Sequence, residues 1–314
     1  MDFSAMDGHQ DMLPPGVPDV ATLRKDARIL LAQIDARERL GTRRVIPLPS
    51  GMWNALYRLE PAGLVAKLSF MGNAFEVDFL RDAAELGVPV PRIYSAGPLE
   101  HAEIPAACYF LMSYEANTAN AWQFLHQHHQ LSLDDLRLLG ADLGAILARL
   151  HTRRLGYLTH FNTQIDRWQQ ALTDGFSPDW ENPAQNSLFD HELLAALRRL
   201  LRETRYFEFS DGAFCHGDLV LTNVLVDTET HRLRAIIDPG NYAGMPMFDL
   251  AYAAMPWDHG FGFHDALLDA YKSRAVFDSV YYAVSQLVVA YRHARFHTPQ
   301  VREYIHDSLL PLLP

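Results

Sequence analysis

Four polar residues have the types and the spacing that phosphoryl transfer requires. His216, Asp218 and Asn223 lie close together in one segment, and Asp238 ends the apolar run that follows. A carboxylate such as Asp218 can accept a proton from a hydroxyl group, and Asn223 and Asp238 offer the oxygen ligands that Mg²⁺ prefers. His-Gly-Asp alone would also fit an ordinary turn between two strands, because Asp and Asn are common in turns. Together, the four residues predict a kinase.

This pattern resembles the catalytic core of the aminoglycoside phosphotransferases and fructosamine kinases, which are small-molecule relatives of the protein kinases. Their motif reads His-Gly-Asp-x-x-x-x-Asn, and the similarity extends over nearly the whole chain after residue 40. The resemblance implies that Asp218 is the catalytic carboxylate and that Asn223 and Asp238 are the metal ligands. It also implies that His216 braces the catalytic loop, while Gly217 allows the tight turn beside it.

A second set of candidate residues, nearer the N-terminus, would bind the nucleotide. Lys67 lies in the apolar strand Leu-Val-Ala-Lys-Leu. A lysine among apolar neighbours needs an anionic partner, and nucleotide phosphates would supply one. The resemblance implies that Glu76, on the following helix, forms the ion pair that fixes Lys67. Asp78, on the same helix, is the competing partner.

Two further segments are candidates for nucleotide contacts. Ser50, Gly51 and Asn54 lie in a hairpin between predicted strands, where a glycine allows backbone N–H groups to approach phosphate oxygens. The corresponding loop of the small-molecule kinases similarly carries Gly followed by Asn, although a simple turn is the alternative. Ser113 and Glu115 fall where the hinge strand of the family offers backbone groups to the purine. These positions do not distinguish ATP from GTP.

The residues after Asp238 argue against a protein kinase. Only ten residues separate Asp238 from Asp249, which is too short for a regulatory activation loop. Pro239 follows Asp238 in place of an aromatic residue, so we expect Asp238 to be held in an extended conformation. Asp249 resembles the acid of the family's Asp-Leu-Ala motif, which braces the catalytic loop, and we expect it to cap a helix.

Other polar residues have less specific patterns. Asp258, His259 and Asp265 lie in an aromatic and acidic segment that could bind an amino sugar or a nucleoside, or could simply connect two elements at the surface. The His-rich segment 126–129 lacks the spacing of a helical zinc site and is read as a solvated loop. His151 ends a Leu-rich helix, and we expect it to interact with the helix dipole.

The apolar periodicity predicts an α+β chain, with a small antiparallel sheet followed by a mostly helical part. The resemblance implies that these form a bilobal, protein kinase-like fold, with the sheet in the N-terminal lobe and the helices in the C-terminal lobe. We expect a nucleotide-binding lobe over 1–113, with an irregular arm over 1–18, and a catalytic and substrate-binding lobe over 114–314. One amphipathic helix should begin at Asp19. The predicted strands are 44–48, 55–60, 64–70 and 109–113, and the predicted helices include 75–83, 132–150, 193–201, 264–272 and 278–296. Ser132 and Asp135 have the spacing of a capping box at the start of the helix 132–150.

Composition limits the partners. The 314-residue chain has 38 acidic and 27 basic residues and a formal net charge of −11, which disfavours binding to nucleic acid or to an anionic membrane. We find neither an apolar run of about 18 residues nor a signal peptide, and therefore expect a cytoplasmic protein. Cys108 and Cys215 lie in apolar stretches and are read as reduced core thiols. We expect a monomer or a homodimer.

The expected activity is an ATP- or GTP-dependent and Mg²⁺-dependent phosphotransferase acting on a hydroxyl group of a small polar molecule. An antibiotic, such as an aminoglycoside, a nucleoside or a related natural product, is the leading acceptor, with a role in antibiotic resistance. A fructosamine or sugar kinase is the enzymatic alternative. A nucleotide-binding regulatory protein without catalysis, built on the same fold, is the alternative from another class.

Overall fold

The computed structural model describes residues 20–49, 54–69, 74–127, 132–155, 212–240, 243–254, 261–292, 303, 305–309 and 311. The chain divides into a smaller unit, Met1–Arg81 with Pro91–Ala116, and a larger unit, Asp82–Val90 with Asn117–Pro314. The division of the chain into lobes over 1–113 and 114–314 stays a prediction. The predicted arm 1–18, the helix 193–201 and the second half of the His-rich segment, 128–129, lie outside the described residues. Its first half, His126 and Gln127, was predicted as loop but ends the helix Ala121–Gln127.

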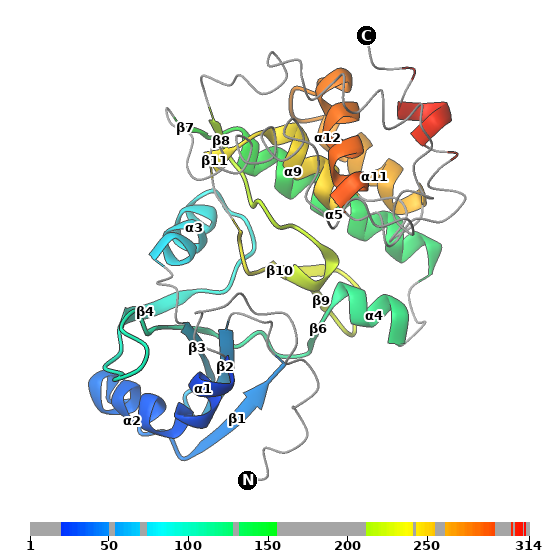
Figure 1. The fold of residues 1–314 in the computed structure, drawn as a ribbon. Coiled ribbons are helices and arrows are strands. Elements are labelled where there is room, and N and C mark those ends of the chain that lie inside the picture. Colours follow the sequence, from blue (N-terminus) through cyan, green and yellow to red (C-terminus); the bar gives the residue numbers. More distant parts are fainter. Residues whose placement is uncertain are drawn as a thin grey trace, which may run out of the picture. The chain divides into compact units, whose positions relative to one another are not determined.

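A five-stranded antiparallel sheet forms the smaller unit (Figure 1). The predicted strands are confirmed, but β4 was not predicted, because its exposed positions and its Ser, Gly and Pro residues hide the strand pattern. β3 is buried at every position after its first, which takes Lys67 into the interior. The strand order is β1 (Arg44–Leu48), β2 (Asn54–Glu60), β3 (Leu64–Ser69), β5 (Cys108–Ser113) and β4 (Ile93–Pro98).

Two helices, α1 (Val20–Lys25) and α2 (Ala27–Glu38), cover this sheet with their apolar residues. The prediction of one continuous helix is wrong, because Asp26 separates α1 from α2. Its backbone has a φ of −96° and a ψ of 5°, and its carboxylate lies 3.1 Å from Nε2 of His101. A contact with a residue far along the chain therefore accompanies the break in the helical pattern.

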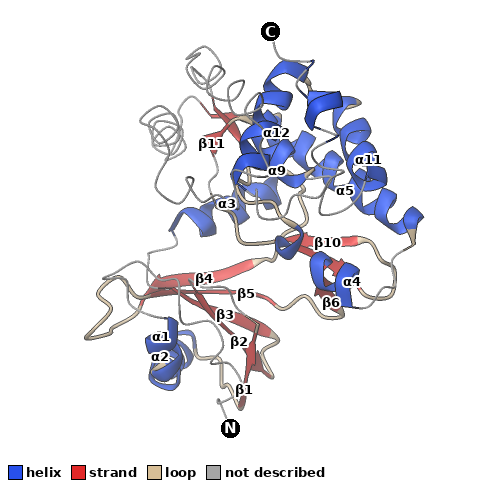
Figure 2. Ribbon diagram, turned by 45° about the vertical axis from the view of Figure 1, so that its right-hand side comes forward, coloured by secondary structure: helices blue, strands red, loops and turns tan. Residues whose placement is uncertain are grey.

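The larger unit is built on four helices that lie side by side (Figures 1 and 2). They are α5 (Leu133–His151), α9 (Pro246–Ala253), α11 (Phe261–Lys272) and α12 (Ser279–Arg292). The Ser132–Asp135 capping box predicted at the start of α5 is present, with the Asp135 N–H donating to Ser132 Oγ at 3.1 Å. The larger unit also holds α4 (Ala121–Gln127) and the 3₁₀ turn η4 (Leu221–Asn223), whereas α3 (Ala74–Glu85) begins in the smaller unit and ends in the larger one.

Two small antiparallel sheets in the larger unit hold the segments that carry the candidate site. In one sheet, β8 leads directly into His216, and in the other, β10 leads into Asp238. The first consists of β11 (Ala243–Gly244), β8 (Gly212–Phe214) and β7 (Arg154–Leu155). The second consists of β10 (Leu233–Ile236), β9 (Val224–Asp227) and β6 (Thr118–Asn120).

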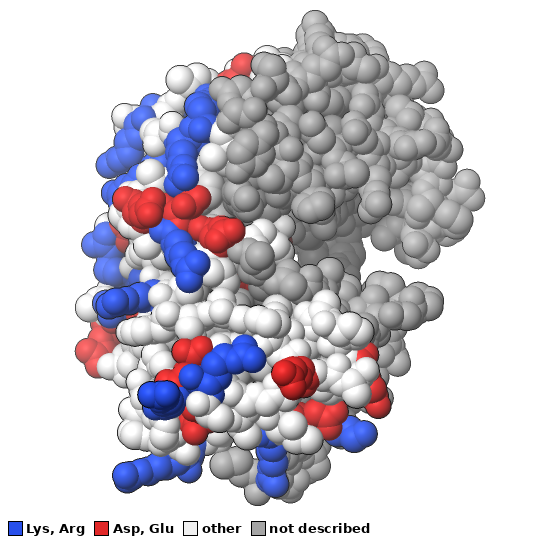
Figure 3. Space-filling view, turned by 90° about the vertical axis from the view of Figure 1, so that its left-hand side faces the viewer, with Lys and Arg blue, Asp and Glu red and all other residues white. Residues whose placement is uncertain are grey.

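Acidic and basic side chains both lie on the described surface. In the described part of the face shown in Figure 3, basic and acidic side chains are interspersed, without a large area of one sign. A nucleic-acid site normally requires clustered Lys and Arg. Among the described helices, we find none that combines the length and the apolar character needed to cross a membrane.

Helices α5 and α11 pack unusually closely, because α5 has glycines at the contact. A Cβ added to Gly144 would lie 2.2 Å from the carbonyl oxygen of Leu267, and one added to Gly140 would lie 2.4 Å from that of Phe263. Glycine inside a helix normally costs about 0.5–1 kcal/mol relative to alanine. The close backbone approach explains why glycine stands at both positions.

We predict that Gly144→Ala lowers the stability of the larger unit by about 1–3 kcal/mol, because the new methyl group forces the two helices apart. Gly262→Ala is the matched control, since its Cβ would meet nothing closer than 3.8 Å. Thermal unfolding of both variants measures the effect. An unfolding midpoint for Gly144→Ala equal to or above that of the control would show that the close packing is not needed.

Candidate active site

The segment 215–223, called the catalytic loop below, joins β8 to β9. Gly217 has a φ of 79°, a left-handed conformation that favours glycine, and it turns the chain just before Asp218. The Val220 N–H donates to the Asp218 carbonyl oxygen at 2.9 Å, and the Asn223 N–H donates to the Val220 carbonyl oxygen at 2.8 Å. These bonds close the loop on itself and bring Asn223 back beside Asp218.

The side chain of Asn223 is bonded to Asp218. Its Nδ2 donates to the Asp218 carbonyl oxygen at 2.8 Å and to Asp218 Oδ2 at 3.2 Å. Asn223 is buried, whereas Asp218 is partly exposed. Because the amide nitrogen is used by Asp218, the amide oxygen is the atom of Asn223 that could bind a cation. The same bond fixes one oxygen of the Asp218 carboxylate.

His216 connects the catalytic loop to the end of β10. Its Nε2 lies 3.1 Å from the carbonyl oxygen of Ile237, and its Nδ1 lies 3.3 Å from the backbone nitrogen of Asp218. A carbonyl oxygen can only accept and a backbone N–H can only donate, so the imidazole is neutral with its proton on Nε2. Burial lowers the pKa of His216, in agreement with a neutral ring. His216 therefore holds the two carboxylate-bearing segments together.

Asp238 lies between two backbone bonds to the catalytic loop. The Ile237 N–H donates to the Asn223 carbonyl oxygen at 2.9 Å, and the Gly240 N–H donates to the His216 carbonyl oxygen at 3.0 Å. The prediction that the following proline holds Asp238 extended is wrong, because the φ of Asp238 is 59°. Asp is among the residues that tolerate this left-handed conformation. The bonds on both sides determine it, and they override the local preference.

Gly240 closely approaches the catalytic loop. A Cβ at this position would lie 2.9 Å from Cβ of Asp218 and 3.4 Å from the carbonyl oxygen of Gly217. Because Cβ of Asp218 is fixed to the backbone, it cannot rotate away from such a contact. The second carboxylate segment can therefore lie against the first only if residue 240 has no side chain.

Asp249, in the first turn of α9, fixes the start of the catalytic loop. Its Oδ2 accepts the His216 N–H at 2.7 Å, and its Oδ1 accepts the Gly217 N–H at 2.8 Å. The prediction that Asp249 caps the helix is wrong, because Met245 is the N-cap residue. Burial alone would raise the pKa of the Asp249 carboxyl, but the hydrogen bond from His151, followed by the backbone N–H of His216, holds it below its usual value. Asp249 braces the loop from within the helix.

Asn223 and Asp238 together provide the donor atoms that Mg²⁺ requires. The amide oxygen of Asn223 and the carboxylate oxygens of Asp238 are hard ligands, and Mg²⁺ is usually held by a few such groups together with water and phosphate oxygens. The backbone bond between Ile237 and Asn223 keeps the two ligand-bearing segments adjacent. That these two residues bind a metal ion stays a prediction, and their oxygen atoms are of the kind that Mg²⁺ prefers.

Lys67 and Glu76 form a buried ion pair in the smaller unit. Lys67 Nζ lies 2.7 Å and 2.9 Å from the two carboxylate oxygens of Glu76, and each side chain is only 5% exposed. Asp78, the alternative partner, is exposed on the same helix. Removing one member of a buried pair leaves an unpaired charge and typically costs about 3–5 kcal/mol. The pair fixes the ammonium group in place before any phosphate binds.

The other predicted nucleotide residues are only partly described. Asn54 begins β2 opposite Ser69, whereas Ser50 and Gly51 lie outside the described residues. Ser113 ends β5, and its Oγ donates to Glu115 Oε1 at 2.8 Å. Their contacts with a nucleotide stay predictions.

Of the three predicted acceptor residues, the structure describes only Asp265. Asp258 and His259 lie outside the described residues, while Asp265 is exposed on α11, with its Oδ1 2.9 Å from Nδ1 of His264. Sequence analysis placed His151 at the end of its helix, and it lies in the last turn of α5, but its burial beside Asp249 was not predicted. Its spacing of four from Leu147 and Leu143 was the signal that could have placed it on the buried face of α5.

We predict that Gly240→Ala slows phosphoryl transfer by about 10-fold to 100-fold, because a displacement of the reacting groups by a fraction of an ångström is costly. Gly240 is exposed, so the thermal unfolding midpoint should change by less than that of Gly144→Ala. Steady-state rates and thermal unfolding measure the two effects, with Gly262→Ala as the control. A native rate in Gly240→Ala would contradict the close approach to Asp218.

Comparison with solved structures finds proteins that share the fold of this chain. The aminoglycoside phosphotransferase APH(3'')-Id from Streptomyces rimosus ATCC10970 is 19% identical, with a TM-score of 0.55 over 85% of this chain and 98% of that protein. APH(2'')-IIa, solved as a ternary complex with streptomycin and ATP, is 15% identical, with a TM-score of 0.52 over 91% and 96%. Choline kinase LicA from Streptococcus pneumoniae is 16% identical, with a TM-score of 0.52 over 92% and 99%. These similarities confirm the predicted fold.

Comparison with proteins of curated function finds no match. The model of the phosphotransferase enzyme family, however, matches residues 45–284. This match includes Lys67, Asp218 and Asp249, and it spans most of the chain. The predicted enzyme class is thereby confirmed, and the chain belongs to the phosphotransferase enzyme family.

Proposed function

We propose that this enzyme transfers the γ-phosphoryl group of Mg²⁺-bound ATP to a hydroxyl group of a small polar molecule. The proposal rests on one observation: hydrogen bonds join Asp218, Asn223 and the segment around Asp238. It combines a partly exposed carboxylate with two oxygen ligands for a metal, and these are the functions that phosphoryl transfer requires of a protein.

Asp218 is the proposed catalytic carboxylate. As the acceptor oxygen attacks the γ-phosphorus, the hydroxyl proton passes to Asp218, and the bond from phosphorus to the bridging oxygen of ADP breaks. The products are a phosphate monoester and ADP. The hydrogen bond from Asn223 Nδ2, at 3.2 Å from Oδ2, fixes the orientation of the carboxylate. The fixed carboxylate can therefore orient the acceptor hydroxyl group as well as accept its proton.

Asn223 and Asp238 would hold the metal ion through oxygen atoms. A bound Mg²⁺ neutralises the charge of the phosphate groups. Lys67, held by Glu76, would bind phosphate oxygens through its ammonium group. Ser50, Gly51, Asn54, Ser113 and Glu115 are the further residues proposed to contact the nucleotide. ATP is the proposed donor because a relative of the same fold has been solved with it, and GTP is the alternative.

An antibiotic is the proposed acceptor, with antibiotic resistance as the proposed role. One relative with this fold is named as an aminoglycoside phosphotransferase, another is named as a ternary complex with streptomycin and ATP, and a third is named as a choline kinase. These named acceptors include cations, and the formal net charge of −11 of this chain favours their approach. Asp258, His259 and Asp265 are the proposed acceptor contacts. Acceptor identity depends on such loops, and the fold does not determine it.

We predict Mg²⁺-dependent consumption of ATP with at least one member of a panel of aminoglycosides, nucleoside antibiotics, sugars and fructosamines. Asp218→Asn should lower kcat by about 10²-fold to 10⁴-fold and leave nucleotide binding intact. Asp238→Asn should weaken Mg²⁺-dependent nucleotide binding. Asparagine is the substitution of choice there because it tolerates the left-handed backbone and removes only the charge. Coupled-enzyme rates and calorimetric binding measure both effects.

Asp78→Asn is the matched control, because Asp78 is an exposed acid that contacts none of these groups in the described structure. It should behave as the native protein. Nucleotide binding that persists without Mg²⁺, together with an absence of turnover for every acceptor, would contradict the proposed transfer and favour the nucleotide-binding regulatory protein.

A further inference from the structure

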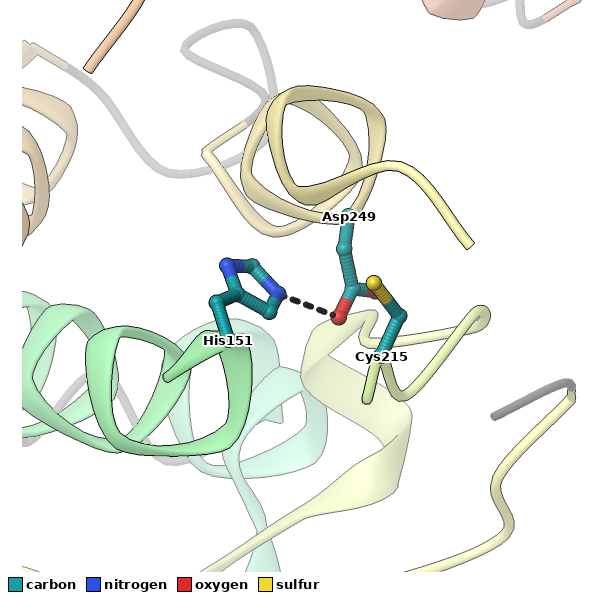
Figure 4. A group of neighbouring side chains, drawn as sticks. All are labelled: His151, Cys215 and Asp249. Carbon is teal, nitrogen blue, oxygen red and sulfur yellow. Dashed lines mark hydrogen bonds and ion pairs between the residues drawn. The ribbon is translucent and has the colours of Figure 1, made fainter. Parts of the chain in front are cut away.

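A buried row of three polar side chains lies behind the catalytic loop. His151 Nε2 lies 3.2 Å from Asp249 Oδ2, and His151 Nδ1 lies 2.9 Å from the hydroxyl oxygen of Tyr271. In Figure 4, His151 extends from the end of α5 toward Asp249 on α9. The side chains of His151 and Asp249 are each only 1% exposed, and Tyr271 is 1% exposed. This row does not touch the reacting groups, and sequence analysis did not predict it.

The hydrogen-bond roles in this row follow from Tyr271. Burial raises the pKa of its hydroxyl group, so that Tyr271 stays protonated and can donate to His151 Nδ1. With Nδ1 as the acceptor, the ring proton of His151 is on Nε2 and is directed at Asp249. The tyrosine therefore selects the form of His151 that donates to the carboxylate.

The bond from His151 determines how the Asp249 carboxylate is oriented. Each carboxylate oxygen accepts one backbone N–H of the catalytic loop, at 2.7 Å from His216 and at 2.8 Å from Gly217. Rotation of the carboxylate would break at least one of these bonds and release the turn just before Asp218. His151 donates to Oδ2 from the opposite element, α5, and opposes that rotation.

We propose that His151 and Tyr271 are positioning residues for phosphoryl transfer, which act through Asp249 on the backbone of the catalytic loop. This inference rests on the proposed function, because its consequence is the placement of Asp218. The effect should fall on kcat, since the nucleotide-binding pair Lys67 and Glu76 lies in the other unit. A role confined to stability would instead lower the unfolding midpoint and leave kcat unchanged.

Because Cys215 lies beside the same cluster, a metal site is the alternative interpretation. The ligand atoms of His151, Cys215 and Asp249 all lie within 4.8 Å of one another, as a buried metal site would require (Figure 4). However, burial raises the pKa of the Cys215 thiol well above its usual value, whereas zinc binds the thiolate. Both oxygens of Asp249 already accept hydrogen bonds. We therefore assign the cluster to hydrogen bonding.

The test compares four variants with the native enzyme. His151→Leu removes the donor, and His151→Gln restores one, because the glutamine amide can reach the place of Nε2. Tyr271→Phe removes only the hydroxyl group behind His151. Tyr282→Phe is the matched control, because Tyr282 makes a similar buried bond to a histidine, 3.1 Å from His264 Nε2, and this bond does not involve Asp249 or the catalytic loop.

We expect kcat to fall about 10-fold to 100-fold in His151→Leu, with KM for ATP within about twofold of native. The fall should be smaller in Tyr271→Phe and in His151→Gln, and Tyr282→Phe should keep the native kcat. Native kcat in His151→Leu, or equal losses of kcat in His151→Leu and Tyr282→Phe, would overturn the proposal. One equivalent of zinc in the purified native protein would also overturn it, because zinc would occupy the Asp249 oxygens.

Hydrogen exchange tests the same brace without any turnover. The amides of His216 and Gly217 should exchange at least about 10-fold faster in His151→Leu than in the native protein or Tyr282→Phe, because a weakened acceptor leaves them open to solvent. Unchanged exchange would overturn the proposal even if the enzyme is active. If the native protein transfers no phosphoryl group, the proposed function fails, while the exchange result still decides whether His151 holds the loop.

Discussion

The candidate site depends on one buried carboxylate. Asp249 is almost completely removed from water, and a charge in such a place is stable only when hydrogen-bond donors surround it. Those donors are two consecutive backbone N–H groups of the catalytic loop and the ring of His151. The hydrogen bonds that the buried carboxylate of Asp249 requires therefore tie the catalytic loop to α9 and α5. Because the helices are held by apolar packing, the loop takes on their rigidity.

The geometry at the reacting groups follows from this fixed turn. Gly217 reverses the chain, His216 reaches Ile237, and the backbone bonds from Ile237 and Gly240 return to the loop. These bonds place Asp238 in a left-handed conformation that costs local backbone energy. The hydrogen bonds on both sides of Asp238 offset this cost. A site of this kind is preorganised, since its carboxylates and amide are oriented by protein contacts alone.

Much of this could be predicted from the sequence. The His-Gly-Asp motif, the apolar strand of Lys67 and the capping box of α5 are local patterns, and each predicted its element correctly. The conformation of Asp238 was predicted wrongly, because contacts with the catalytic loop override local preference. For Asp249, the expected brace of the catalytic loop is present, whereas the expected helix cap is wrong, because the loop uses both oxygens of the carboxylate. The buried contacts of His151 were not predicted for a related reason: its partners lie 98 and 120 residues further along the chain. Gly240 was missed because its role depends on a spatial neighbour, Asp218.

The most direct test of this account is the rate of phosphoryl transfer by Asp249→Asn, measured together with its affinity for Mg²⁺-ATP. The asparagine side chain has nearly the shape of the carboxylate, but its NH₂ group is a hydrogen-bond donor. This group would face a backbone N–H of the loop, which is also a donor. The account predicts a folded variant that binds the nucleotide with native affinity and has a kcat lower by about 10²-fold. A native kcat in this variant would show that the catalytic loop holds its geometry without the Asp249 brace, and would contradict the account.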